Sequence, residues 1–242
     1  MCGVFGFACP SRATARAGNL TRREWALAHQ LMVELAIASE ERGTDAAGYA
    51  VLTVDGEMLW QRQPGPARHL FLGKGFAALR HKDVVMAIGH TRFATTGAPA
   101  VNGNNHPHLA GDWALVHNGF IPLHERKAAA LGIRLKSQCD SELLVQVLDR
   151  YGEAEGPEVC LALGGKQSVL AINARGRAML AWTNGEMPLV AFEVEGLPEV
   201  WWASTTEIAA GAAAKLGKSV GFYRVRPRVV YRLSGEGSPV QA

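Results

Sequence analysis

The chain has 242 residues, of which 48% are hydrophobic and 19% are charged, an ordinary composition for a globular protein with room for one substantial core. The formal net charge is only +3, and the basic residues are scattered apart from Arg224, Arg226 and Arg228. This distribution argues against a nucleic-acid-binding function.

The cysteines and the apolar segments bear on the cellular environment. The four cysteines stand at 2, 9, 139 and 160 and include no C-x-x-C pair, which argues against zinc-ribbon and thioredoxin-like proteins. The start of the sequence lacks the basic and apolar regions of a signal peptide, and no apolar run is long enough to span a membrane. We therefore expect a cytoplasmic protein with reduced thiols and no membrane partner.

Up to residue 111, the sequence predicts strands around one long helix. In chain order, the elements are a Gly-broken strand at 2–8, a helix at about 21–41, strands at 46–54, 57–62 and 84–91, and a loop at 93–111. Thr21 and Glu24 have the spacing of a capping box at the start of the helix. Asp55-Gly56 is a favoured hairpin turn between two of the strands.

After residue 111, helices come early and strands then dominate. In chain order, we predict a strand at 112–117, helices at 122–131, 140–151 and 156–163, strands at 167–173, 177–182, 188–194 and 199–203, a helix at 206–216, strands at 219–226 and 228–233, and a frayed tail at about 235–242. Strands and helices do not alternate strictly, so a doubly wound parallel sheet is disfavoured. A layered α+β fold with antiparallel sheets, forming a single domain over 1–242, fits better.

Cys2 is the first candidate for chemistry. Removal of the initiator Met would leave its thiol beside a free α-amine, whose ordinary pKa is about 8. One residue would then supply both nucleophile and base, which is the arrangement of N-terminal nucleophiles. The competing interpretation is a small buried residue in the first strand, and on Cys2 alone that interpretation is favoured.

Two motifs contain arginines with candidate roles. Arg92 ends an apolar strand, where its guanidinium can hold a carboxylate with two hydrogen bonds and where Thr95 could add a hydroxyl donor. The alternative is an arginine that pairs with a nearby Asp or Glu at the end of the strand. Between the long helix and the next strand, Arg42 and Asp45 are expected to form a supporting ion pair.

The His117-Asn118-Gly119 segment follows a predicted strand. Asn-Gly is usually a turn signal. The alternative is an oxyanion hole, in which the Asn118 amide and the Gly119 N–H point at one developing negative oxygen. We expect His117 to be structural, because the α-amine of Cys2 would act as the base.

Asp140 stands at the start of a predicted helix, either as its N-cap or as a group that holds a substrate ammonium, and the two roles can coexist. His106 and His108, in Asn-His-Pro-His, suggest a metal pair only weakly, because no third ligand stands at metal-like spacing. We therefore expect no metal and a loop or interface role for these histidines.

The order and spacing of five motifs resemble the class II glutamine amidotransferases, which are N-terminal-nucleophile hydrolases. The closest resemblance is to the glutaminase domains of glucosamine-6-phosphate synthase and amidophosphoribosyltransferase, and the segments 188–190 and 203–206 extend it over nearly the whole chain. It implies a four-layer αββα fold with two mainly antiparallel sheets between helical layers. The motifs are Met1-Cys2-Gly3-Val4-Phe5-Gly6, Arg42-Gly43-x-Asp45-x-Ala47-Gly48, Gly89-His90-Thr91-Arg92, His117-Asn118-Gly119 and Asp140-Ser141-Glu142.

The resemblance also implies a role for each matching residue. These roles are Cys2 as the nucleophile, Asn118 and Gly119 as the oxyanion hole, Arg92 with help from Thr95 as the binder of the glutamine α-carboxylate, and Asp140 as the binder of its α-amine. The implied reaction is hydrolysis of L-glutamine to glutamate and ammonia through a Cys2 thioester, without a cofactor.

The sequence leaves the wider function open between three hypotheses. We favour a glutaminase subunit that delivers ammonia to a separate synthase or ligase protein. The alternative is a stand-alone hydrolase of γ-glutamyl amides other than glutamine. A non-catalytic module that keeps the fold is disfavoured, because every catalytic-type residue is present. Homo-oligomerisation is left open.

Overall fold

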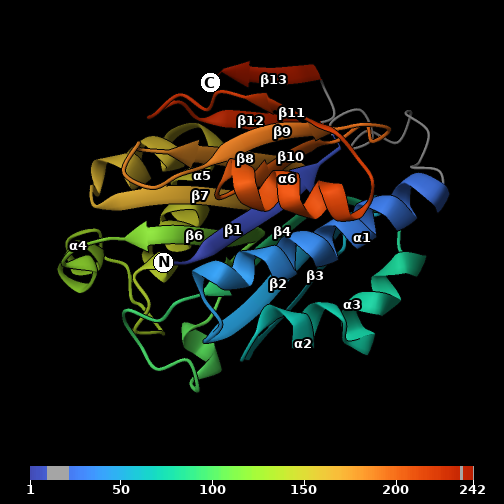
Figure 1. The fold of residues 1–242 in the computed structure, drawn as a ribbon. Helices are drawn as coiled ribbons and strands as arrows, with labels where there is room; N and C mark the ends of the chain where they lie inside the picture. Colours follow the sequence, from blue (N-terminus) through green and yellow to red (C-terminus); the bar gives the residue numbers. More distant parts are fainter. Residues whose placement is uncertain (10–21, 235–236, 242) are drawn as a thin grey trace.

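Two antiparallel β-sheets lie face to face at the centre of the computed structural model, which describes residues 1–9, 22–234 and 237–241 (Figure 1). The seven-stranded sheet has the order β11 (Val220–Tyr223), β9 (Val190–Val194), β10 (Val200–Ala203), β1 (Gly3–Ala8), β4 (Val84–Arg92), β2 (Ala46–Thr53) and β3 (Met58–Pro64). The six-stranded sheet has the order β13 (Gly237–Gln241), β12 (Tyr231–Ser234), β8 (Ala178–Thr183), β7 (Lys166–Asn173), β6 (Trp113–Phe120) and β5 (His108–Ala110).

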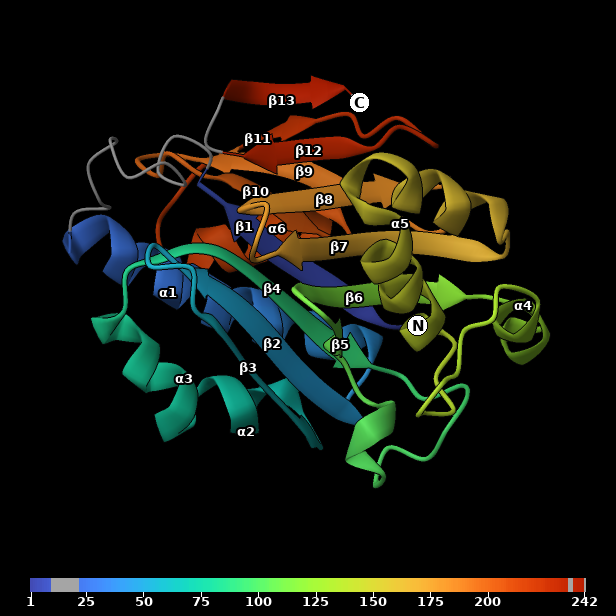
Figure 2. The same cartoon turned by 180° about the vertical axis from the view of Figure 1, so that it is seen from behind.

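Helices cover the outer face of each sheet. The seven-stranded sheet is covered by α1 (Arg22–Ala38), α2 (Ala67–Phe71), α3 (Lys74–Ala78) and α6 (Thr206–Lys215). Helix α5 (Ser141–Ala162) covers the six-stranded sheet, as the reverse view in Figure 2 shows, and α4 (His124–Ala130) lies near the end of β6. Short 3-10 helices are η2 (Ser39–Arg42), η3 (Leu79–His81) and η4 (Asn102–Asn104).

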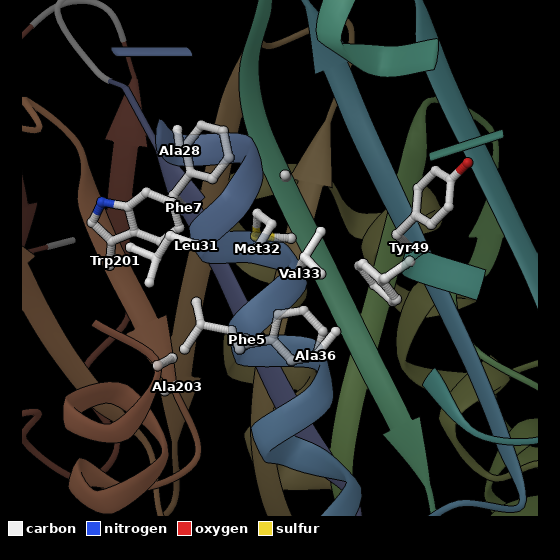
Figure 3. Packing of buried hydrophobic residues seen from close by; sticks show 14 of the residues in the cluster. Phe5, Phe7, Ala28, Leu31, Met32, Val33, Ala36, Tyr49, Trp201 and Ala203 are labelled. Carbon is white, nitrogen blue, oxygen red and sulfur yellow. The ribbon is translucent and has the colours of Figure 1, made fainter. Parts of the chain in front are cut away.

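The layers are held together by three hydrophobic clusters of described residues, one in each gap between layers. Side chains alternate between the two faces of a strand. On β1, Phe5 and Phe7 therefore pack against α1 and its neighbours, while Val4 and Ala8 face the other sheet. Figure 3 shows the first of these groups, in which the rings of Phe7 and Trp201 lie 4.8 Å apart.

The predicted four-layer α+β fold is confirmed, with antiparallel pairing in both sheets. The two helices predicted at 140–151 and 156–163 form one element, α5, that is interrupted at Gly152, where φ is 72°. The predicted cap residue Thr21 lies outside the described residues. None of the helices in the described ranges has the length and apolar character that a membrane span requires.

Further differences concern short segments. The sequence does not predict helices α2 and α3, because five residues are too few to show helical periodicity. Strand β5 lies inside the predicted loop 93–111, where Gly, Pro and Asn dominate. In the C-terminal segment the structure describes β13, which pairs with the edge of β12, and fraying of the tail at about 235–242 stays a prediction.

Candidate active site

The predicted site residues gather where the ends of β1, β4 and β6 meet. Cys2 directly precedes β1, whose first residue, Gly3, pairs with Thr91 near the end of β4. From β4, His90 reaches across to the other sheet, and its Nε2 donates to the carbonyl oxygen of His117 at 3.1 Å. The two sheets are thus in direct contact one residue before Asn118.

Cys2 is half-buried beside the start of the loop that follows β4. The backbone N–H of Phe93 points at its Sγ at 3.4 Å, and the Nε of Arg42 donates to its carbonyl oxygen at 2.7 Å. Burial raises the pKa of the Cys2 thiol and outweighs the lowering by the Phe93 N–H, the N-terminal ammonium and Arg92; Asp140 raises it further. The charges of Arg92 and Asp140 therefore both act on the pKa of the Cys2 thiol.

Arg92 is only 3% exposed and organises the loop after β4. Its guanidinium donates to the side-chain oxygen of Asn105 at 2.7 Å and to the carbonyl oxygens of Thr96 at 2.5 Å and Gly97 at 2.7 Å. These partners are neutral, unlike the Asp or Glu considered from the sequence. Since a guanidinium has five N–H donors, it keeps donors for a further partner. Thr95 lies exposed on the same loop.

Asn118 and Gly119 lie within β6 and not in a turn after a strand, as the Asn-Gly pattern suggested. They pair with Ser168 and Gln167 of β7. The alternation along β6 places Asn118 on the same face as Val116, toward the seven-stranded sheet. Asn118 is 1% exposed, and its Nδ2 has no hydrogen-bond partner among the described residues.

Glycine at position 119 is required by the close pairing of β6 and β7. A Cβ atom there would lie 1.8 Å from the carbonyl oxygen of Lys166, so any side chain would force the strands apart.

Asp140 is buried at the start of α5, but its carboxylate does not cap that helix. It accepts a hydrogen bond from the backbone N–H of Ile121 at 2.6 Å and so ties α5 to the segment after β6. His117 has both ring nitrogens engaged, Nδ1 with the Ser141 hydroxyl at 2.9 Å and Nε2 with the Lys166 carbonyl at 3.0 Å. These contacts tie β6 to α5 and β7, and a structural role for His117 stays a prediction.

The expected ion pair between Arg42 and Asp45 is wrong, because each side chain holds a different part of the site. Arg42 binds the Cys2 carbonyl, and the Asp45 carboxylate accepts from the Ala94 N–H at 2.8 Å. Both residues belong to a motif that the sequence singles out. Asn105, which holds Arg92, is a residue that sequence reasoning missed, because nothing in the pattern separates it from its loop neighbours.

No family model matches the chain. Among curated proteins, it is similar to glutamine–fructose-6-phosphate aminotransferases. That of Pseudomonas putida is 36% identical over 152 residues, covering 61% of this chain and 22% of the relative. That of Pseudomonas syringae pv. tomato is 30% identical over 203 residues, covering 78% of this chain and 30% of the relative. The chain thus spans about a fifth to a third of the length of these relatives.

Solved structures share the fold over 99% of this chain. The glutamine phosphoribosylpyrophosphate amidotransferase of Bacillus subtilis superposes with a TM-score of 0.71 at 19% identity, and the match covers 49% of that chain. A glutamine aminotransferase class-II domain protein from Silicibacter pomeroyi superposes with a TM-score of 0.55 at 15% identity over 99% of its length. The chain is therefore a homologue of the glutamine amidotransferases, and the resemblance to the class II type that its motifs predicted is confirmed.

Proposed function

We propose that this chain is a glutaminase that hydrolyses L-glutamine to glutamate and ammonia, with Cys2 as an N-terminal nucleophile. The observation that carries the proposal is the side chain of Asn118. Its Nδ2 is a buried donor with no partner in the part of the chain that the structure describes, and it lies near the end of β6, which faces the sheet whose strand β1 follows Cys2. A buried donor of this kind normally has a partner, and a developing oxyanion would provide one.

The first chemical step uses both ends of Cys2. After removal of Met1, the α-amine of Cys2 takes the proton of the thiol, and the sulfur attacks the side-chain amide carbon of glutamine. The resulting tetrahedral oxyanion accepts hydrogen bonds from the Asn118 amide and the Gly119 N–H. One such donor typically contributes about 3 kcal/mol to stabilisation of the transition state.

The remaining steps release the two products. The protonated α-amine gives its proton to the departing nitrogen, which leaves as ammonia, and a γ-glutamyl thioester remains on Cys2. The same amine then accepts a proton from a water molecule that attacks the thioester carbonyl. The products are glutamate and the regenerated thiol.

Two buried opposite charges support the choice of a free amino acid as the substrate. Arg92 would bind the α-carboxylate and Asp140 the α-ammonium, with Thr95 beside the carboxylate. Arg92 and Asp140 are 3% and 5% exposed, and the charges of both reach the Cys2 sulfur. A glutamine within a polypeptide has neither charged group, so it would leave both side chains without a partner of opposite charge and bind poorly.

We further propose that the ammonia serves a separate synthase or ligase protein. The curated relatives carry the names of aminotransferases, and this chain matches only a fraction of their length. Their names include an acceptor for the amino group, which supports the proposal.

The test is a panel of substrates with the purified chain. We expect ammonia and glutamate to form from free glutamine, and Cys2→Ala to abolish their formation. Cys160→Ala is the matched control, because Cys160 lies on α5 and is buried in the cluster between that helix and the six-stranded sheet. Cleavage of a γ-glutamyl amine or peptide by a chain that ignores free glutamine would contradict the proposal.

A further inference from the structure

Three buried side chains that could bind a metal meet behind the candidate active site. His106 lies in the loop before β5, His108 begins β5, and Cys139 comes just before α5. They are 3%, 2% and 4% exposed. One ligand atom from each lies within 4.8 Å of the other two. The sequence showed only the histidine pair, because Cys139 is distant in the chain and comes close only through the fold.

The histidines of this cluster are not explained by hydrogen bonding. Both ring nitrogens of His106 and the Nε2 of His108 are buried, and none of the residues that the structure describes is a hydrogen-bond partner to them. Their other contacts are with rings, since His106 stacks on His90 at 3.8 Å and meets the edge of His108 at 4.8 Å. Buried imidazoles usually have at least one nitrogen satisfied, so these free nitrogens point to a ligand.

We propose that His106, His108 and Cys139 form a binding site for one transition-metal ion of the zinc type. Two imidazole nitrogens and one thiolate sulfur are the donors that such ions prefer. Ligand atoms around tetrahedral zinc lie roughly 3.3–3.6 Å apart, so small side-chain rotations would bring these three groups into position. This site is independent of the proposed glutaminase reaction.

The surroundings of the cluster carry charges of both signs. A metal would bind the Cys139 sulfur as a thiolate, so binding would release the thiol proton. Arg62 and Arg92 act on the cluster with positive charge, while Asp140 adjoins Cys139 with negative charge.

A metal at this position would join the two sides of the candidate glutamine pocket. His106 follows Asn105, which holds the guanidinium of Arg92, and Cys139 precedes Asp140. The ion would fix the loop after β4 to the start of α5. This positioning role, unlike the site itself, rests on the proposed function.

The test is titration of the metal-free full chain with Co²⁺, which reports a thiolate ligand through a sulfur-to-metal charge-transfer absorption band. We expect one equivalent to bind with this band, and Zn²⁺ to remove it by displacement. Cys139→Ala should lose the band and weaken Co²⁺ binding by at least ~100-fold. Cys2→Ala and Cys160→Ala should both keep the band.

The absorption does not depend on glutamine hydrolysis, so the two proposals can fail separately. Absence of the band in folded wild-type protein with excess Co²⁺ would overturn the metal site, whatever the variants do. Loss of the band in Cys2→Ala with retention in Cys139→Ala would overturn the proposed metal site as well, because the metal would then be bound by the Cys2 thiolate. Circular dichroism of each variant establishes that it is folded.

Discussion

At the scale of single residues, the candidate site depends on groups whose hydrogen-bonding capacity is left over after folding. Arg92 uses its guanidinium to shape the loop after β4 and still has N–H donors, and the buried amide nitrogen of Asn118 has no partner within the described part of the chain. Leaving such groups unsatisfied costs stability, which is usual where a ligand completes the set. Under the proposed function, the substrate would supply the remaining partners of both residues.

Asn118→Ala gives a direct test of the oxyanion role. We expect kcat for glutamine hydrolysis to fall roughly 100- to 1,000-fold with little change in KM, because the amide would act only on the transition state. Asn173→Ala is the control, since Asn173 lies on neighbouring β7 and binds Glu153. Steady-state kinetics in which Asn118→Ala and Asn173→Ala behave alike would remove Asn118 from the mechanism.

Sequence reasoning reached some of these residues and not others. Cys2, Arg92 and Asp140 stand in motifs with a characteristic order, so their types and spacing suffice. Arg42 stands in a recognisable motif, but the sequence suggests the wrong partner for it. The i, i+3 spacing favours Asp45 and does not reveal that the fold brings the backbone of Cys2 to the guanidinium. The unpartnered state of Asn118 depends on every neighbouring group and cannot be read from the sequence.

At the scale of elements, strands with clear alternation or a continuous apolar run were predictable, and short or polar elements were not. The buried strands β2 and β4 agree with prediction to within one residue at each end. Strand β6 extends three residues beyond its predicted end, because pairing with β7 overrides the turn tendency of Asn118-Gly119. Tertiary pairing thus placed the candidate oxyanion hole within a rigid sheet.

Helix α1 contains a buried histidine that should make stability depend on pH. The Nε2–H of His29 donates to the Phe76 carbonyl at 2.9 Å, and the Nε–H of Arg80 donates to its Nδ1 at 3.4 Å. Protonation would place an N–H against Arg80. Burial lowers the pKa of His29, and Arg80 lowers it further, although the Phe76 carbonyl opposes the shift.

Because the pKa of His29 is lowered in the folded state, its contribution to the unfolding free energy is complete above the unfolded-state pKa of about 6.5. That contribution is lost as the pH falls below this value. We expect His29→Gln to reduce the pH dependence of the unfolding free energy between about pH 7 and pH 5, by at most the uptake of one proton. Urea unfolding at several pH values measures this slope. His81→Gln, at an exposed position, should leave the wild-type slope unchanged. Equal slopes for the wild type, His29→Gln and His81→Gln would contradict this prediction.

At the scale of the whole molecule, the layered fold brings together residues that are far apart in the chain. The four layers follow from strand alternation, which loads both faces of each sheet with apolar side chains. The distance between the layers cannot be predicted from the sequence. The contact between His90 and His117 and the approach of Cys139 to His106 and His108 both depend on how the sheets and α5 are packed.

The proposed reaction requires a mature chain that begins at Cys2 and reacts with substrate through its thiol. Intact-mass measurement of active protein, before and after treatment with a glutamine-analogue electrophile, tests this directly. We predict a mass without Met1 and a single label on Cys2, because Cys9, Cys139 and Cys160 are 0%, 4% and 0% exposed. Full glutaminase activity in protein that retains Met1, or inactivation by a label on another cysteine, would contradict it.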